Sequence, residues 1–357
     1  MRVLIAGGGT GGHVIPALAI ARELRDVHSA EVRFVGTARG LETELVPAAN
    51  FPLDLIRVGQ LKNVTLGTRA RTLADLPLGV LRCVSLLRAH RSHVVVGVGG
   101  YASGPMMLAA IVRGTPTLAF EPNAVPGLAN RLVGRRVSAA AVNFAATCAY
   151  FRGAVVTGIP VRQEFFAIVP KTTAGQRLLV FGGSQGARVL NEILPQIASG
   201  LLRRFPELTI LHQTGARHRD RVLAAYENAG ITTDRLQVKP YVERMVEEVA
   251  AADVILCRSG ASTAAELAAA GRCAVLVPFA AAADDHQRRN AEVMVAAGAA
   301  RMILETELTP VRAEAEISTL LQNADSRQRM ANAARLLAHQ DAAERIAAMC
   351  LELASPV

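Results

Sequence analysis

A histidine follows a glycine-rich turn near the start of the chain, in the segment AGGGTGGH that ends at His13. The turn lies between the apolar run RVLIA and a helical pattern, so we expect His13 close to the N-terminus of a helix. The positive end of a helix dipole disfavours a charged imidazole, and a neutral imidazole can accept a proton. The pattern therefore indicates a general base, with helix capping or contact with a phosphate as the alternative interpretations.

Three glycine-rich turns follow apolar runs, namely AGGGTGGH, GVGGYASGP and FGGSQGAR. Glycine lets backbone N–H groups approach a ligand, and the helix that follows directs its positive end to the same place. Each turn is thus a candidate anion site, and close packing of strand on helix is the alternative. The first turn also spells the dinucleotide fingerprint Gly7-x-Gly9-x-x-Gly12, but residues 36–38 lack the acid expected to hold a ribose. Arg39 keeps an NADP-dependent oxidoreductase open as an alternative.

The segment CRSGASTAAELAAAG, residues 257–271, predicts a strand that ends at Cys257 and a helix that begins at Ser262 or Thr263. Glu266 then lies in the first turn of the helix, where a carboxylate can accept hydrogen bonds from the vicinal hydroxyls of a ribose. A capping box formed by Thr263 and Glu266 explains the same residues without a ligand. Both interpretations are open at this point.

Polar side chains gather again in the segment PFAAAADDHQRRNA, where His286, Gln287 and Asn290 fall within about one helical turn. Amide side chains both donate and accept, so they suit sugar hydroxyls, and they equally suit an exposed helix start. Asp284 and Asp285 resemble a metal-binding pair, but a helix N-cap is the preferred interpretation. We therefore expect no metal bound by the protein.

The elements that must position these residues are short apolar runs that alternate with Ala- and Leu-rich helical patterns. Strands separated by helices in this way are typical of parallel sheets in doubly wound α/β domains. The length of 357 residues and the 51% of apolar residues predict two such domains. The segment GIPVRQEFFAIVPKTT, residues 158–173, breaks the alternation and marks the boundary.

The net charge of +9 comes almost wholly from arginine and is compatible with nucleic acid, anionic lipid or a phosphorylated substrate. Nucleic acid is the least favoured partner, because no aromatic platform, zinc site or helix-turn-helix pattern accompanies the charge. Five scattered cysteines indicate a reducing cytosol. No leader peptide or spanning apolar run is recognised, so we expect a protein that is soluble or that rests on a membrane surface.

Six motifs in fixed order carry a family resemblance: GGGTGGHVIPALAIA, GGYASGP, EPNAVPGLANR, GIPVR, GGSQGARVLN and CRSGASTAAELAAAG. Together they resemble the MurG family, the N-acetylglucosaminyltransferases of bacterial cell-wall synthesis, over about residues 2–300. The resemblance implies an α/β GT-B fold of two Rossmann-like domains that face a cleft. It implies residues 1–162 as the acceptor-binding and membrane-facing domain, 163–340 as the UDP-GlcNAc domain, and 341–357 as a helix that returns to the first domain.

The implied reaction is inverting transfer of GlcNAc from UDP-GlcNAc to the C4 hydroxyl of MurNAc-pentapeptide in lipid I, which forms lipid II. UDP-GlcNAc is then a co-substrate, and no cofactor is expected. A related GT-B enzyme with another lipid or small-molecule acceptor is the alternative function. His13 would be the catalytic base beside the reacting hydroxyl.

The remaining site residues follow from the resemblance by matching motif. The donor side would comprise Thr10, Gly11, Gly12, Asn123, Arg162, Ser184, Gln185, Ala261, Thr263, Glu266, Gln287 and Asn290. The acceptor side would comprise Gly8, Gly9 and Tyr101. Pro122 and Ile159 depart from the family pattern, and His286 is an alternative to Gln287.

A membrane contact is expected in the segment LGTRARTLADLPLGVLRCVSLLRAHR, residues 66–91, which mixes leucines with arginines such as Arg82 and Arg88. A crossover helix that packs on its own sheet explains the same pattern. The resemblance places the protein peripherally on the cytoplasmic face of the cell membrane, against an anionic inner leaflet. It also implies roles in cell shape and cell division and allows complexes with other cell-wall enzymes.

Overall fold

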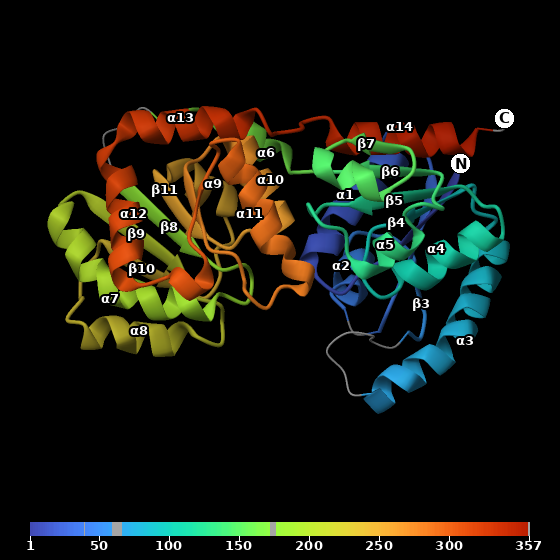
Figure 1. Ribbon diagram of the computed structural model, residues 1–357, viewed down its shortest axis with the longest axis horizontal. Coiled ribbons are helices and arrows are strands. Elements are labelled where there is room, and N and C mark those ends of the chain that lie inside the picture. The colour runs from blue at the N-terminus through green and yellow to red at the C-terminus, as the bar shows by residue number, and fades with distance from the viewer. Residues whose placement is uncertain (39, 59–65, 172–175, 356–357) are drawn as a thin grey trace. The chain divides into compact units, whose positions relative to one another are not determined.

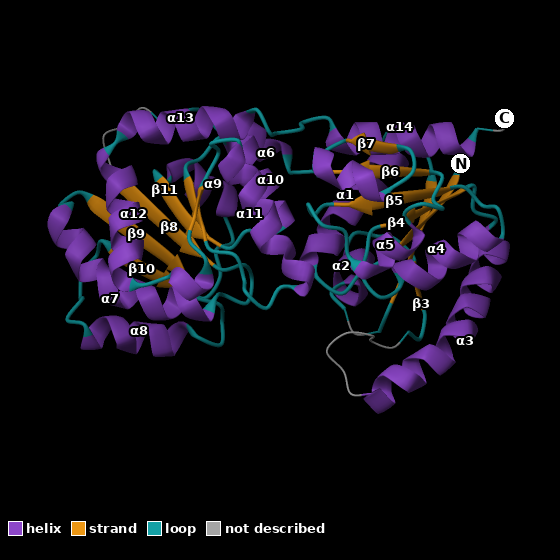
Figure 2. Cartoon of the chain, viewed as in Figure 1, coloured by secondary structure: helices purple, strands orange, loops and turns teal. Residues whose placement is uncertain are grey.

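The computed structural model describes residues 1–38, 40–58, 66–171 and 176–355, with the backbone alone for residues 66–76 and for Ala283. The chain divides into two compact units. Unit 1 comprises Met1–Val161 and His339–Val357, and unit 2 comprises Arg162–Ala338. Each unit contains one parallel sheet with helices on both of its faces (Figures 1 and 2).

Unit 1 has a seven-stranded parallel sheet in the order β3-β2-β1-β4-β5-β6-β7. Its strands are β1 (Arg2–Ala6), β2 (Glu31–Gly36), β3 (Leu53–Leu55), β4 (Val94–Gly97), β5 (Thr117–Glu121), β6 (Ala139–Val142) and β7 (Ala154–Val156). Its helices are α1 (Gly11–Asp26), α2 (Glu42–Ala48), α3 (Leu66–His90), α4 (Ser103–Val112), α5 (Leu128–Val133), the 3-10 helix η1 (Ala145–Tyr150) and α14 (Ala342–Ala354). The last of these packs on α1, β4 and β5.

Unit 2 has a six-stranded parallel sheet in the order β10-β9-β8-β11-β12-β13. Its strands are β8 (Gln176–Phe181), β9 (Leu208–Gln213), β10 (Leu236–Lys239), β11 (Val254–Cys257), β12 (Ala274–Leu276) and β13 (Arg301–Met302). Its helices are α6 (Gln163–Phe166), α7 (Arg188–Arg204), α8 (Arg219–Asn228), α9 (Met245–Ala251), α10 (Ala261–Ala270), α11 (His286–Ala296), α12 (Pro310–Gln322), α13 (Ala324–Arg335) and the 3-10 helices η2 (Ala283–Asp285) and η3 (Glu305–Glu307).

The two sheets share one order over six strands, and unit 1 adds β7 at its edge. In each sheet the first three strands follow one another in one direction, and the chain then crosses back to add the remaining strands on the other side. The reversal lies between β1 and β4 in unit 1 and between β8 and β11 in unit 2. In open parallel sheets, ligands bind outside the carboxyl ends of the strands at this reversal point. The loops after these four strands are therefore where each unit should bind a substrate.

The central strands form by burial of continuous apolar runs, as expected for sheets that are covered on both faces. Every residue of β4, β5 and β11 is buried. The fold class predicted from the sequence, two doubly wound parallel-sheet domains, is confirmed. Eight apolar runs predict strands, namely RVLIA, VRFVG, HVVVGVG, TPTLAF, RLLVF, LTILHQ, DVILC and CAVLVPF. All eight are present, as β1, β2, β4, β5, β8, β9, β11 and β12, whereas β3, β6, β7, β10 and β13 were not predicted.

The helix after β11 differs in detail from the prediction. It begins at Ala261 rather than at Ser262 or Thr263, and its N-cap is Gly260, with no side chain that caps it. The capping box of Thr263 and Glu266 is therefore wrong, because Thr263 lies inside the first turn. Glu266, which was predicted in the first turn of the helix, lies in its second turn.

Candidate active site

His13 lies in the first turn of α1, and its ring is half-buried. Its Nδ1 lies 3.1 Å from the carbonyl oxygen of Gly8. Because a carbonyl oxygen only accepts, Nδ1 carries the proton and Nε2 keeps the lone pair in the neutral ring. A Cβ placed on Gly99 would lie 3.1 Å from Nε2, so this nitrogen faces the loop after β4. The basic atom is thus directed to the reversal point of the unit 1 sheet.

The glycine loop before His13 is organised by Glu42, a residue that the sequence analysis did not single out. Its side chain is buried, and its Oε2 accepts from the N–H of Gly9 over 2.7 Å. Its Oε1 accepts from both the N–H and the hydroxyl of Thr37, each over 2.9 Å. The Gly9 amide predicted to face the acceptor is therefore directed to a carboxylate of the protein itself. A signal was present in the sequence, since Glu42 begins the helical pattern after the second strand.

The loop after β4 completes the carboxyl edge of unit 1. Gly100 packs against the backbone of Gly8 so closely that a Cβ there would overlap it, and its φ of +80° is one that glycine favours. Tyr101 follows with 43% of its surface exposed. The structure thus brings Tyr101 to the same edge as His13. Arg39, the alternative anchor for NADP, lies outside the described residues.

Asn123 is held by a buried acid at the end of β5. Glu121 accepts through Oε1 from the backbone and the side-chain amide of Asn123, over 3.0 and 3.1 Å. Its Oε2 accepts from Gly127 and from Asn130, both over 3.0 Å. These four bonds fix the EPNAVPG loop in one conformation. Glu121 is thus a supporting residue that the sequence analysis quoted only as part of a motif.

Ser184 and Gln185 are exposed on the loop after β8, just before α7. The backbone of the loop turns tightly, because Gly186 donates to the carbonyl of Gly183 over 2.9 Å. A Cβ at Gly186 would overlap the carbonyl of Thr214, so the loop rests directly on the chain after β9. The exposed tip of this loop has the form expected of an anion site at a helix N-terminus.

Glu266 lies on α10, half-buried, near Arg162 at the start of α6. Burial raises the pKa of the Glu266 carboxyl to about 7, while the positive charge of Arg162 acts in the opposite direction. The guanidinium of Arg162 lies over the ring of Phe165, 5.0 Å from the ring centre, in a cation–π contact. The structure thus brings together two residues that the motifs had placed about a hundred positions apart.

The loops after β11 and β12 are joined to α11 by hydrogen bonds. Ser259 donates from its hydroxyl to the carbonyl of Gln287 over 2.8 Å, and Asn290 donates from Nδ2 to the carbonyl of Ser259 over 3.3 Å. The Oε1 of Gln287 accepts from the N–H of Phe279 over 3.0 Å. Asn290 is fully buried, whereas Gln287 is half-buried. The predicted sugar-binding amides therefore lie at the reversal point of unit 2, and both take part in its framework.

Arg258 joins the loop after β11 to the loop after β12 and to Glu305. Its Nη1 donates to the carbonyls of Val277 and Pro278 over 3.1 Å and pairs with Glu305 over 2.9 Å. Ala261 is buried and Thr263 half-buried on α10. Asp285 stands at the N-cap of α11 without a side-chain cap bond, and His286 begins the helix.

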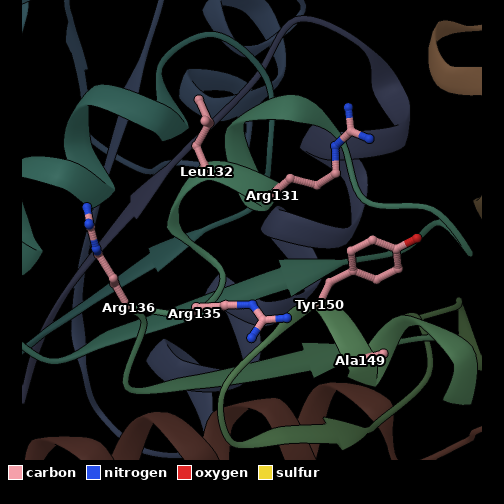
Figure 3. A pocket seen from close by; sticks show the side chains of 6 residues that line it. All are labelled: Arg131, Leu132, Arg135, Arg136, Ala149 and Tyr150. Carbon is pink, nitrogen blue, oxygen red and sulfur yellow. The ribbon is translucent and has the colours of Figure 1, made fainter.

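No group of three or more potential metal ligands is found within the described residues. A separate cavity of about 490 Å³ opens on unit 1 between α5 and η1. Figure 3 shows the side chains that line it: Arg131, Leu132, Arg135, Arg136, Ala149 and Tyr150. Three guanidiniums and no acid among the lining residues suit an anionic group. None of the six was predicted as a site residue, although the spacing of the arginines is visible in the sequence.

Each unit thus offers a different chemistry. Unit 1 presents an imidazole whose basic nitrogen faces a loop edge, which suits proton removal from a hydroxyl. Unit 2 presents a glycine loop, a carboxylate and an arginine at one sheet edge, which suits a phosphorylated ligand with ribose hydroxyls.

Models of known families match both units. The glycosyltransferase family 28 N-terminal domain matches residues 3–142, and the glycosyltransferase family 28 C-terminal domain matches residues 177–346. The crystal structure of MurG from Acinetobacter baumannii superposes with a TM-score of 0.83 at 31% identity, covering 98% of this chain and 99% of that one.

Curated relatives extend the match to the whole chain. A protein of Anaeromyxobacter dehalogenans (strain 2CP-1 / ATCC BAA-258) is 46% identical over 99% of this chain and 93% of its own length. A protein of Solibacter usitatus (strain Ellin6076) is 43% identical over 99% of this chain and 96% of its own length. Both carry the same name, which describes an N-acetylglucosamine transferase. The chain therefore belongs to the family of UDP-N-acetylglucosamine--N-acetylmuramyl-(pentapeptide) pyrophosphoryl-undecaprenol N-acetylglucosamine transferases, the MurG glycosyltransferases of GT-B fold.

Proposed function

We propose that this chain transfers N-acetylglucosamine from UDP-N-acetylglucosamine to the C4 hydroxyl of the muramyl sugar in lipid I, undecaprenyl-pyrophosphoryl-MurNAc-pentapeptide. The product is lipid II, with inversion at the anomeric carbon. The observation that carries the proposal is the orientation of His13 in a chain that is 46% identical, over 99% of its length, to a relative named for this transfer.

His13 is the general base in this proposal. Its Nε2 removes the proton from the C4 hydroxyl as the hydroxyl oxygen forms a bond to the anomeric carbon of GlcNAc. The bond between that carbon and the β-phosphate breaks on the opposite face, and UDP leaves with the electron pair. Support comes from the contact with Gly8, which leaves the lone pair on Nε2 and directs it to the loop edge.

The donor is proposed to bind at the carboxyl edge of unit 2. Ser184 and Gln185 hold the diphosphate at the N-terminus of α7, and Arg162 offsets the charge that develops on the departing UDP. Glu266 accepts hydrogen bonds from the ribose hydroxyls, while Ala261 and Thr263 line the same helix end. Gln287 and Asn290 bind the GlcNAc. The exposed tip of the 182–186 loop supports this assignment.

The acceptor is proposed to bind at the carboxyl edge of unit 1, beside Gly8, Gly9 and Tyr101. Because the Gly9 N–H already bonds to Glu42, the positive end of α1 at Thr10, Gly11 and Gly12 is the better place for a phosphate. This helix end was assigned to the donor in the sequence analysis. A diphosphate on either substrate would satisfy the same backbone groups.

Contact with an anionic membrane surface is proposed for unit 1. Residues 55–161 contain twelve lysines and arginines but only two acids, an excess of ten positive charges in a chain whose total is +9. On α3, Leu78 and Leu81 are 68% and 64% exposed, and Arg82 and Arg88 are exposed beside them. Exposed leucines flanked by arginines suit the headgroup region. The cavity lined by Arg131, Arg135 and Arg136 adds a site for an anionic group.

The protein is proposed to lie peripherally on the cytoplasmic face of the cell membrane, where lipid I is exposed. Within the described residues, no helix combines the length and apolar character needed to cross a bilayer. The five cysteines are thiols, as expected in a reducing compartment. Roles in cell shape and cell division, and complexes with other cell-wall enzymes, follow from lipid II synthesis. We propose neither a cofactor nor a resident metal.

The proposed function is tested by product analysis with the wild-type protein. UDP-GlcNAc is offered with a short-chain lipid I analogue or with unrelated lipid and small-molecule acceptors, and the linkage in the product is read by NMR. A β-linked GlcNAc on the C4 oxygen of the lipid I analogue alone supports the proposal. Transfer to a different acceptor, with the lipid I analogue unchanged, would leave the proposed donor site intact but contradict the proposed acceptor.

A further inference from the structure

One peptide group connects a buried carboxylate to the imidazole of His13. The N–H of the Gly8–Gly9 peptide donates to Oε2 of Glu42 over 2.7 Å. The carbonyl of the same peptide lies 3.1 Å from Nδ1 of His13. In a trans peptide the N–H and the C=O point in opposite directions, so Glu42 and His13 lie on opposite sides of one planar group.

The carboxylate in this arrangement is ionised and firmly held. Burial by itself raises the pKa of Glu42, but hydrogen bonds from Gly9, Thr37 and its own backbone outweigh burial and leave the pKa below its usual value. Only 1% of the side chain is exposed. The donors from Gly9, Thr37 and the Glu42 backbone are neutral groups, so dipoles stabilise the negative charge.

The local sequence is built around this carboxylate. A Cβ at Gly8 or at Gly40 would overlap the carboxyl group of Glu42, and a Cβ at Gly36 would lie 2.6 Å from its Cγ. Small residues therefore surround the carboxylate on three sides. The hydrogen bonds of this carboxylate to Gly9 and Thr37 hold the Gly8–Gly9 peptide in its orientation.

We propose that Glu42 is a positioning residue that acts on His13 through the Gly8–Gly9 peptide. The proposal rests on the proposed role of His13 as the general base. The carboxylate polarises the peptide, which makes the Gly8 carbonyl a stronger acceptor for the Nδ1 proton. This fixes the tautomer with the lone pair on Nε2 and makes Nε2 more basic, as a directly bonded carboxylate does in other catalytic histidines.

Few other titratable groups lie on the segments that pack at this point. Glu44 is exposed on α2, and Tyr101 follows the loop after β4 that faces His13. Arg39 precedes Gly40 in the sequence but lies outside the described residues. Glu42 is thus the buried charge on the described part of these segments, and Glu44 is a natural control of the same charge and helix.

The test compares Glu42→Gln with Glu44→Gln, using the pH dependence of kcat/KM for the acceptor. Glutamine has one acceptor oxygen, whereas both carboxylate oxygens accept in the wild type, and it carries no charge. Loss of the charge disfavours the imidazolium, so the acidic limb of the Glu42→Gln profile moves to lower pH. On the plateau, kcat falls about threefold to tenfold because Nε2 is a weaker base. Glu44→Gln leaves both features unchanged, and the KM for UDP-GlcNAc stays the same in both variants.

A second measurement does not depend on turnover. Nitrogen-15 NMR of the imidazole should show wild-type His13 as the neutral tautomer with its proton on Nδ1, identified by the signal that His13→Ala removes. A proton on Nε2, or an acidic limb of Glu42→Gln that coincides with the wild type, would overturn the proposal. If His13→Ala retains full transfer, the proposed base is wrong instead, so the two failures are distinguishable.

Discussion

Gln213 donates from Nε2 to the carbonyl oxygen of Gly183 over 2.9 Å, and its Oε1 accepts from the N–H of Val242 over 3.1 Å. The side chain is 1% exposed at the end of β9. One buried amide therefore joins the glycine loop after β8 to the segment after β10. Gln213 thus fixes the positions of the chain segments that follow β8, β9 and β10 relative to one another.

Gln213→Ala should weaken UDP binding, because the loop that carries Ser184 and Gln185 loses its anchor. The buried N–H of Val242 and the carbonyl of Gly183 also lose their partner, so the free energy of unfolding should fall by about 1–3 kcal/mol. Isothermal titration with UDP and urea unfolding measure the two effects. Gln237→Ala, an exposed glutamine on β10, is the control and should change neither. If UDP affinity is unchanged in Gln213→Ala, Gln213 does not support the donor site.

Glu266 gives a prediction for pH. Because its pKa is raised from 4.5 to about 7, the folded protein holds more protons than the unfolded chain between these values. The free energy of unfolding without ligand should therefore fall as pH rises through this window, and Glu266→Gln should remove that contribution. Thermal unfolding at a series of pH values measures the slope.

The same carboxyl governs the pH dependence of donor binding. Ribose hydroxyls donate to the ionised form, so UDP affinity should decrease as pH falls below about 7, and binding should release a proton. Titrations in buffers of different ionisation enthalpy report the number of protons released. If UDP affinity does not change between about pH 6 and pH 8 at constant ionic strength, the assignment of Glu266 to the ribose is contradicted.

Arg258→Ala should destabilise unit 2 strongly. The pair with Glu305 is mostly buried, with 10% and 17% of the two side chains exposed, and its removal leaves a buried carboxylate without its cation. The expected loss is about 3–5 kcal/mol. Arg312→Ala breaks the exposed pair with Glu307 and should cost about 1 kcal/mol or less. If the two variants lose the same free energy of unfolding in urea, the buried pair of Arg258 with Glu305 contributes no more stability than the exposed pair.

Much of the fold was predictable because it depends on local apolar patterns. Strands such as β1 and β11 are short apolar runs beside glycine turns, and these were predicted. β6 was not predicted, because its sequence AAAV favours helix and only its position between β5 and β7 makes it a strand. Tertiary context decided its conformation.

Site residues that lie within a sequence motif could be predicted. Residues that support the site by hydrogen bonds from distant parts of the sequence could not. His13 and the 182–186 loop follow strands directly, so their position was visible in the sequence. Glu42 acts on Gly9 from 33 residues away, and Gln213 acts on Gly183 from 30 residues away. Nothing in a single sequence links such pairs, because each contact exists only after the sheet has formed.

Membrane contact by unit 1 predicts that charge reversal on α3 releases the protein from anionic vesicles. Each arginine at an anionic surface contributes about 1 kcal/mol, so Arg82→Glu with Arg88→Glu should weaken binding by roughly 30-fold or more. Flotation with phosphatidylglycerol vesicles measures it. Arg217→Glu with Arg219→Glu makes the same change of charge on exposed residues of unit 2 and should leave binding unchanged. Equal release by both pairs would point to net charge alone.

The central claim is that His13 removes the proton from the acceptor hydroxyl. It is tested most directly by the single-turnover rate of GlcNAc transfer to a short-chain lipid I analogue, for the wild type, His13→Ala and the control His218→Ala. We predict that the rate falls about 100- to 10,000-fold in His13→Ala, while UDP affinity and the control rate stay at the wild-type value. A rate in His13→Ala within about twofold of the wild type would contradict the account.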